Sequence, residues 1–206
     1  MKRWPFASLV STLLPSLVCF GACFGCAQSS GKVVHAEVLA TTAHPEDVLS
    51  IDAIIGAMYD VLSGPAGQPR QWSRDRDLYV PDVRFFIMSA NENHEAVLRI
   101  VSQPEFVELY DRTLTEKGFY EKEIHRETQR FGNMAHVFST YESRQTAGGP
   151  VTNRGINSVE LVYHGHRWWI ASIVWDDERP DNPIPDEFRP NWKTDMYPNP
   201  NPNAPR

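Results

Sequence analysis

Cysteine is nearly absent from this sequence. The 206 residues include three cysteines, and all of them lie near the start of the chain, at Cys19, Cys23 and Cys26. The chain after residue 26 can therefore form no disulfide, offers no thiolate nucleophile and holds no cysteine-based zinc site.

The signature motifs of several enzyme classes are also missing. The chain has no P-loop, no glycine-rich dinucleotide fingerprint, no Gly-x-Ser-x-Gly elbow and no His-Glu-x-x-His motif. These absences argue against phosphoryl transfer, nicotinamide chemistry, serine hydrolysis and zincin proteolysis, so no cofactor and no metal ion are expected. The net charge is −6 and no basic run is present. A nucleic-acid partner, which needs a positive surface, is therefore not expected.

The first residues predict export. Lys2 and Arg3 precede the uncharged, largely apolar run Ser8–Phe20, and small residues follow it. The run is shorter than the about 20 residues of a membrane-spanning helix, so residues 1–27 are expected to be a secretory signal. Cleavage after Ala27 and lipidation at Cys23 both remain open. We expect a periplasmic protein, or one that a lipid anchors to the membrane.

The middle of the chain predicts one domain, at residues 45–178, after a polar linker at 28–44. Pro45 suits the first turn of a helix, whose apolar face repeats every three or four residues up to the stop at Gly64. Ser102 and Glu105 form a capping box for a second long helix, which Gly118 ends. A short helical turn is expected at 72–78, and strands at 83–88, 119–130, 134–143, 156–164 and 167–175. Helices followed by a meander predict an α+β fold, with helices packed on one face of a curved antiparallel sheet.

The last strand has no polar face. Strict alternation places Trp169, Ile173 and Trp175 on one side, and the residues on the other side are also largely apolar. One side can pack under the helices, and the other then needs a cover, because a large exposed apolar patch usually marks an interface. We expect a homodimer through the outer sheet face at these three residues. The alternative cover is the proline-rich tail, residues 179–206, which carries the apolar Phe188 and Trp192.

Two segments carry a family resemblance: Leu78–Phe85 (LYVPDVRF) and Gly165–Ile170 (GHRWWI). With the order of helices and strands, they make residues 45–178 resemble the NTF2-like superfamily, in particular its SnoaL-like bacterial branch. The resemblance implies a cone, in which helices close a strongly bent sheet around a pocket, and dimers formed through the sheet. Relatives include isomerases, dehydratases, cyclases, ligand binders and scaffolds. Many relatives carry a histidine or serine on the inward face of the last strand, where this chain has Val174 and Asp176.

The strands carry the candidate acid–base groups. His125 and Glu127 share one face of a strand, and His136 lies on the next strand. An imidazole beside a carboxylate can move protons near neutral pH. The alternative interpretation is a solvated or cross-strand ion pair without a catalytic role. The polar residues expected to contact a ligand in the pocket are Tyr59, Ser139, Tyr141, Ser172 and Asp176.

Two functions are compatible with these features. The first is a non-catalytic dimer that binds a small apolar molecule or serves as a scaffold. The second is a cofactor-independent isomerase, dehydratase or cyclase, with a histidine or carboxylate as the acid or base. The absent motifs and the missing inward histidine favour the first. The deciding feature is whether a histidine or carboxylate points into a cavity beside a hydroxyl donor.

Overall fold

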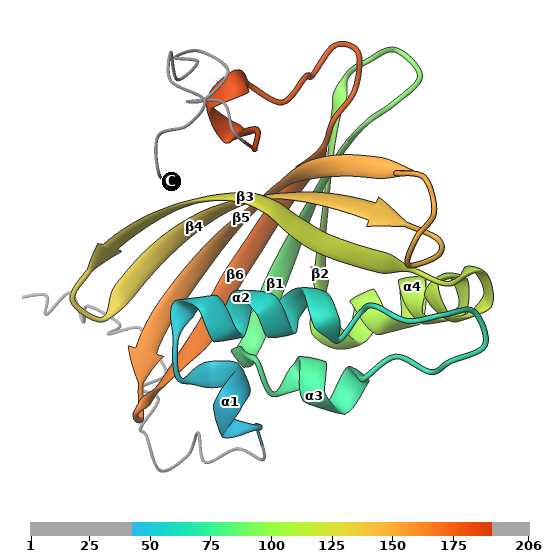
Figure 1. The fold of residues 1–206 in the computed structure, drawn as a ribbon. Coiled ribbons are helices and arrows are strands. Elements are labelled where there is room, and N and C mark those ends of the chain that lie inside the picture. The colour runs from blue at the N-terminus through green and yellow to red at the C-terminus, as the bar shows by residue number, and fades with distance from the viewer. Residues whose placement is uncertain (1–42, 191–206) are drawn as a thin grey trace, which may run out of the picture. The chain divides into compact units, whose positions relative to one another are not determined.

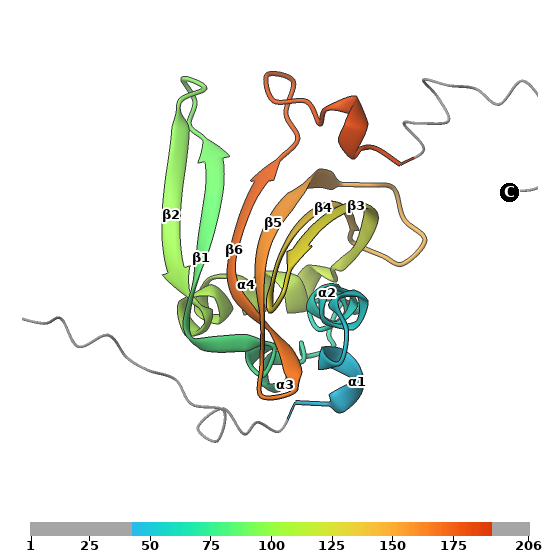
Figure 2. The same cartoon turned by 90° about the vertical axis from the view of Figure 1, so that its left-hand side faces the viewer.

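The computed structural model describes residues 43–190. In this part of the chain, short and long helices pack against a six-stranded curved sheet (Figure 1, Figure 2). The expected signal, residues 28–42 of the linker and the end of the tail lie outside the described residues. No described helix has both the length and the apolar character needed to cross a membrane.

The first helical segment is interrupted, where the sequence predicted one continuous helix. Helix α1 spans Pro45–Val48 and α2 spans Ile51–Asp60. Between them, the Ser50 hydroxyl accepts a hydrogen bond from the Ala53 amide at 3.0 Å and caps α2. The continuous-helix expectation is wrong because a serine cap, which satisfies an otherwise unpaired amide, starts a new helix at this point.

The other helices lie where the sequence predicted them. Helix α3 spans Trp72–Arg76, and α4 spans Gln103–Lys117. The capping box of Ser102 and Glu105 is present at the start of α4. Gly118 ends α4 with a φ of 74°, and a Cβ at this position would lie 2.6 Å from a backbone oxygen. Glycine fits this turn without strain, and the turn delivers the chain directly into the next strand.

One sheet contains all six strands, in the order β2-β1-β6-β5-β4-β3. The five expected strands are present, and the edge strand β2 is an addition that its uneven apolar pattern did not reveal. Strands β1 and β6 pair in parallel, whereas the other neighbours are antiparallel. The strands are β1 Tyr79–Ala90, β2 Ala96–Ser102, β3 Tyr120–Phe131, β4 Met134–Arg144, β5 Asn153–His164 and β6 Arg167–Asp177.

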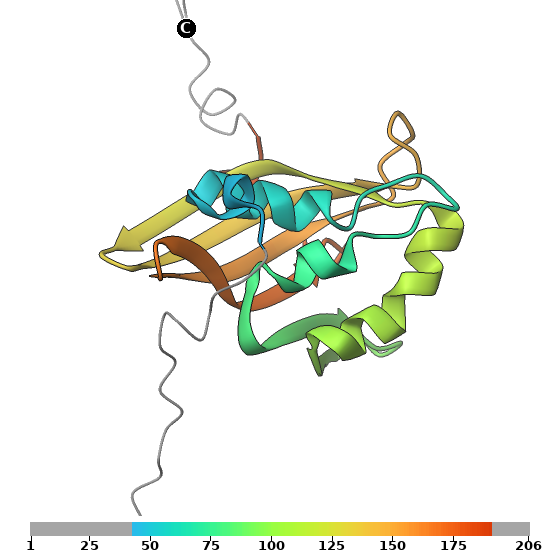
Figure 3. The ribbon, with the colours of Figure 1, turned by 90° about the horizontal axis from the view of Figure 1, so that it is seen from below.

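The helices cover the concave face of the sheet and bury the core against it. Seen from below, α2 and α3 lie across the strands while α4 lies towards the side of β1 and β2 (Figure 3). Ile54 and Ile55 of α2 are fully buried, as are Val137, Val159 and Ile170 of the central strands. The expected arrangement of helices on one face of a curved sheet is therefore confirmed.

A register shift in the last hairpin decides which side chains of β6 face inward. Strands β5 and β6 slip by one residue midway along the hairpin, so strict alternation fails within β6. Ile173 and Trp175 therefore line the inside of the sheet. Trp169 is 2% exposed, and the Arg167 guanidinium lies 3.6 Å from its ring centre. The expectation that Trp169, Ile173 and Trp175 form one exposed outer face is wrong.

The residues after β6 fold back over the outer face of the sheet. A short 3₁₀ helix, η2, spans Asp186–Phe188. The Phe188 ring lies 4.8 Å from that of Phe138, and the Thr140 hydroxyl donates to the Phe188 carbonyl oxygen at 2.7 Å. The described part of the tail thus covers β4, rather than the tryptophan strand as the alternative interpretation expected.

Candidate functional site

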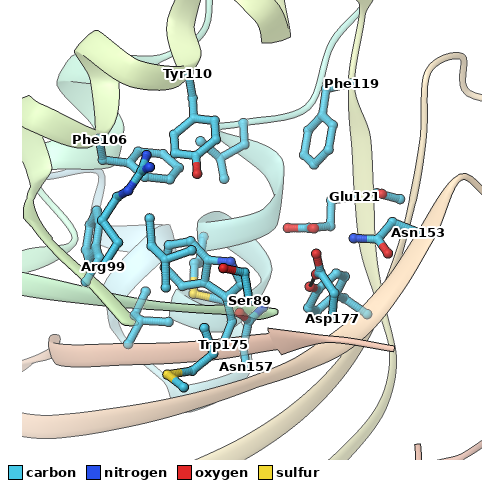
Figure 4. A pocket seen from close by; sticks show the side chains of 18 of the residues that line it. Ser89, Arg99, Phe106, Tyr110, Phe119, Glu121, Asn153, Asn157, Trp175 and Asp177 are labelled. Atoms are coloured by element: carbon cyan, nitrogen blue, oxygen red, sulfur yellow. Dashed lines mark hydrogen bonds between the residues drawn. The ribbon is translucent and has the colours of Figure 1, made fainter. Parts of the chain in front are cut away.

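The concave side of the sheet holds a cavity of about 430 Å³, which is lined by residues of the sheet and of α4 (Figure 4). Its middle is aromatic, with Phe85 and Trp175 from the sheet and Phe106 and Tyr110 from α4. The Phe106 ring stands edge-on to those of Phe85 and Trp175, at 5.3 and 6.0 Å between centres. A cavity of this volume and lining is suited to a small, largely apolar ligand.

Glu121 points into this cavity from the start of β3 (Figure 4). Its amide donates to the Ser63 hydroxyl at 3.1 Å, which ties the backbone of Glu121 to the segment that follows α2. Its carboxyl group makes no hydrogen bond to another described residue. Burial, followed by the charge of Asp177, raises the pKa of Glu121 from its ordinary value of 4.5 to about 8. This carboxyl group therefore keeps its proton at neutral pH.

Asp177 enters the same end of the cavity from the end of β6. The Tyr141 hydroxyl, on β4, donates to Asp177 Oδ1 at 2.5 Å. Strand β5 lies between these two strands, and Gly155 leaves the room for this contact, because a Cβ there would lie 2.3 Å from Tyr141 Oη. Burial, followed by the charge of Asp177, raises the pKa of Tyr141 well above its ordinary value. The hydroxyl therefore stays a donor.

The two carboxyl groups converge although they come from distant strands. Figure 4 shows Glu121 and Asp177 turned towards the same space, with Asn153 beside them. Glu121 lies on the edge strand β3, and Asp177 lies three strands away in the sheet order. The strong curvature of the sheet brings the two groups together.

Asn157 connects the cavity to a buried chain of hydrogen bonds. Its amide donates to Tyr59 Oη at 3.0 Å, and Tyr59 Oη lies 2.7 Å from Ser139 Oγ. Ser139 in turn donates to Glu123 Oε1 at 2.5 Å. Burial raises the pKa of Tyr59, so its hydroxyl stays protonated. Tyr59 and Ser139, two expected ligand contacts, thus lie behind the wall and hold Asn157 in place.

The three expected acid–base residues lie on the outer face of the sheet. His125 Nε2 is 3.4 Å from Glu127 Oε1 within the same strand, so this contact is not the cross-strand ion pair of the alternative interpretation. His136 Nε2 lies 3.0 Å from Ser158 Oγ. None of the three is among the residues that line the cavity. A register shift between β3 and β4, just before His125, reverses the alternation that places Glu121 inside.

Of the remaining expected contacts, Tyr141 lines the cavity, whereas Ser172 and Asp176 do not. Asp176 accepts a hydrogen bond from Arg179 Nη1 at 2.5 Å and fixes the start of the tail. The slip in the β5–β6 hairpin turns Asp177 inward in its place. A one-residue shift of this kind moves every later side chain to the other face.

Sequence reasoning missed both Glu121 and Asp177. Glu121 lies in a strand with polar residues on both faces, and its one signal is its position shortly after the glycine that ends α4. That signal is too common to identify a site. Among residues 43–190, no group of three or more histidine, cysteine, aspartate or glutamate residues could hold a metal ion. The cavity offers instead a proton on Glu121, the Asp177 carboxylate and apolar walls.

The architecture is NTF2-like: helices close a curved six-stranded sheet around an internal cavity, as the sequence resemblance implied. No protein-family model matches the chain, and no curated protein matches its sequence. Among solved structures, it is similar to a Nostoc punctiforme protein of unknown function with a cystatin-like fold (7% identity, TM-score 0.49, covering 64% of this chain and 91% of that one).

Two further solved structures are NTF2-like proteins of unknown function. The one from Silicibacter pomeroyi has 14% identity and a TM-score of 0.41, covering 62% of this chain and 92% of that one. The one from Methylobacillus flagellatus has 13% identity and a TM-score of 0.42, covering 63% and 95%. The similarity to these structures lies in the path of the backbone.

Proposed function

We propose that the protein is a cofactor-independent enzyme that uses Glu121 as a general acid to dehydrate or cyclise a small, largely apolar compound. One observation carries the proposal: a carboxyl group with no hydrogen-bond partner among the described residues points into an apolar cavity beside a second carboxylate. A carboxyl group that holds its proton at neutral pH can deliver it to a substrate, and active sites often create such groups by burial.

The sign of the charge at this end of the cavity favours acid chemistry. Glu121 and Asp177 are the acidic lining residues, and no basic lining residue lies beside them (Figure 4). Such a site stabilises positive charge that develops on a substrate and repels an enolate. Dehydration and cation-driven ring closure therefore fit better than isomerisation through an enolate. The aromatic walls, with Phe106 and Trp175, add favourable contacts to a cation.

In a dehydration, Glu121 gives its proton to the leaving hydroxyl group. The C–O bond breaks and water leaves, while the Asp177 carboxylate stabilises the positive charge on carbon. The Glu121 carboxylate then takes a proton from the adjacent carbon, so that the C=C bond forms and the acid is restored. The hydrogen bond from Tyr141 holds Asp177 in position throughout.

The second candidate function is non-catalytic binding of an apolar molecule, which the sequence favoured. The aromatic middle of the cavity supports this function because it can hold such a molecule without any reaction. Both candidate functions predict that the cavity binds an apolar molecule, and only the enzyme is expected to convert it to a product. Turnover therefore distinguishes the two.

The test is a search for loss of water or ring closure in a panel of small tertiary and allylic alcohols, followed by mass spectrometry. Glu121→Gln should lower kcat/KM by about 10²- to 10⁴-fold, as expected for a lost general acid. Activity should fall as the pH rises above about 8, where Glu121 loses its proton. The matched control is His136→Gln on the outer face, which should leave activity unchanged. Full activity of Glu121→Gln would refute the acid, and binding without any turnover would favour the second candidate.

We also propose that the protein forms a homodimer through a different part of the outer sheet face. Leu98, Ile100 and Val174 are 53%, 52% and 37% exposed. Ile100 and Val174 both neighbour Phe86 in the sheet, so the group is continuous. Exposed apolar groups of this kind support an interface. Ile100→Glu should convert a dimer to a monomer in light scattering, whereas Leu109→Glu on α4 should not. A monomeric wild type at micromolar concentration would refute the dimer.

Export stays a proposal that rests on residues 1–27. Cell fractionation of the full chain should find it in the periplasm, or in the membrane fraction if Cys23 is lipidated. Replacement of Cys23 by alanine should release a lipidated protein from the membrane. A cytoplasmic wild type would contradict export.

A further inference from the structure

A single cation lies at the opposite end of the cavity from the carboxyl groups. Arg99, on the edge strand β2, is the one basic residue among the lining residues that the structure describes. It makes no hydrogen bond and no ion pair with another described residue. Figure 4 shows its guanidinium group turned towards Phe106 and Tyr110, away from Glu121 and Asp177. Arg99 is exposed, which places it at the mouth of the cavity.

The sheet register fixes Arg99 on the inner face. Arg99 pairs with Ile87 of β1, Ile87 pairs with Trp175 of β6, and Trp175 pairs with Asn157 of β5. Side chains at paired positions share a face, so Arg99 stands in the same row as three other cavity residues. The register thus fixes the face of the sheet from which the exposed Arg99 side chain leaves the edge strand.

The two polar ends are well separated. Arg99 lies two strands away from the strand that carries Asp177. Neighbouring strands are about 4.8 Å apart, so the two ends are on the order of 10 Å from one another. The aromatic residues fill this interval. The cavity therefore has a cationic mouth, an apolar middle and an acidic inner end.

We propose that the ligand is an organic anion: a molecule with an acidic head group that Arg99 binds, and an apolar body that places its reactive end at Glu121. Guanidinium groups bind oxyanions through paired hydrogen bonds, and an unpaired arginine at an apolar mouth supplies them. The opposite placement is unfavourable, because an anion at the inner end would meet the carboxylate of Asp177. The proposal deepens the proposed function by naming the substrate class and its orientation.

Two fluorescent probes test the proposal without a known substrate. They are 1-anilinonaphthalene-8-sulfonate and its uncharged analogue N-phenyl-1-naphthylamine, which share the same rings. Wild-type protein should bind the sulfonate more tightly. Arg99→Gln should weaken sulfonate binding roughly tenfold, as expected for one lost charge-assisted contact, and change the neutral probe by less than about twofold. Arg99→Lys should keep most of the sulfonate preference.

The matched control is Arg112→Gln on α4, which removes the same charge outside the cavity lining. It should change neither dissociation constant. The proposal is overturned if Arg99→Gln leaves the sulfonate constant unchanged, if it weakens both probes equally, or if wild-type protein binds neither probe or shows no preference. Thermal unfolding of each variant checks that the fold is intact.

The test of the anion site can fail or succeed independently of the test of the proposed enzymatic activity. The Glu121→Gln variant should still bind the sulfonate, and this binding should still depend on Arg99. The substitution removes only the proton that Glu121 can transfer to a substrate. Loss of the Arg99 effect would therefore overturn the anion preference and leave acid catalysis standing. A protein with the Arg99 effect but no turnover would leave the anion site standing and argue against catalysis.

Discussion

The pKa of Glu121 has a consequence for stability that can be measured without a substrate. The folded protein holds this proton with a pKa of about 8, whereas the unfolded chain has the ordinary value of 4.5. The folded state therefore binds the proton more tightly. Stability is highest where both states are protonated, below pH 4.5, and it falls as the pH rises from 4.5 to about 8.

The size of the effect follows from the shift. A difference of about 3.5 pKa units at about 1.4 kcal/mol each gives an upper limit of about 5 kcal/mol at pH 9. Glu121 is partly exposed to solvent, which eases its ionisation, so we expect a loss of at least about 2 kcal/mol rather than the full amount. Glu121→Gln keeps the shape of the side chain but cannot ionise, and it should not show this loss.

The assay is urea unfolding of both proteins at pH 5, 7 and 9. The variant should be more stable than wild type at pH 9, and the difference should shrink steadily towards pH 5. Glu127→Gln is the matched control on the outer face of the same strand, where the side chain is 52% exposed. It should keep the wild-type pH dependence. Parallel curves for Glu121→Gln and wild type between pH 5 and 9 would refute the raised pKa.

Three further predictions concern the framework of the site, and urea unfolding checks each. Gly155→Ala should lower the free energy of unfolding by about 2–3 kcal/mol, because its Cβ would meet the Tyr141 hydroxyl. Gly56→Ala, whose Cβ would have nothing within 4 Å, should raise the free energy of unfolding by about 1 kcal/mol through the better helix propensity of alanine in α2. Equal effects of the two substitutions would contradict the close contact at Gly155. Burial raises the pKa of Asp75 from 3.8 to about 6, so stability should fall by about 3 kcal/mol as the pH rises from 4 to 6. Asp75→Asn should remove that fall, and an unchanged pH dependence would speak against it. Ser50→Ala should cost about 1 kcal/mol through the lost cap, and a neutral result would show that packing alone starts α2.

The sequence by itself determined the class of fold and most of its elements. Capping-box chemistry at Ser102 placed the start of α4, and the left-handed turn that suits glycine at Gly118 placed its end. Alternating strands of β-branched and aromatic residues, joined by short turns, placed the two long hairpins. These signals are local, because each depends on neighbouring residues along the chain, and such features survive without knowledge of the tertiary structure.

Only the tertiary structure decided which side chains meet in the cavity. Two register shifts, one in each hairpin, exchanged inner and outer faces: His125 went outside, and Asp177 replaced Asp176 inside. A bulge is set by the packing of both strands and leaves no reliable trace in one of them. Sheet curvature then brought Glu121 to Asp177 across the two strands between them, and burial changed the pKa of Glu121. The curvature of the sheet and the burial of Glu121 both depend on many residues that lie far apart in the chain. For this reason Glu121 could not be identified from the sequence as the acid of the site.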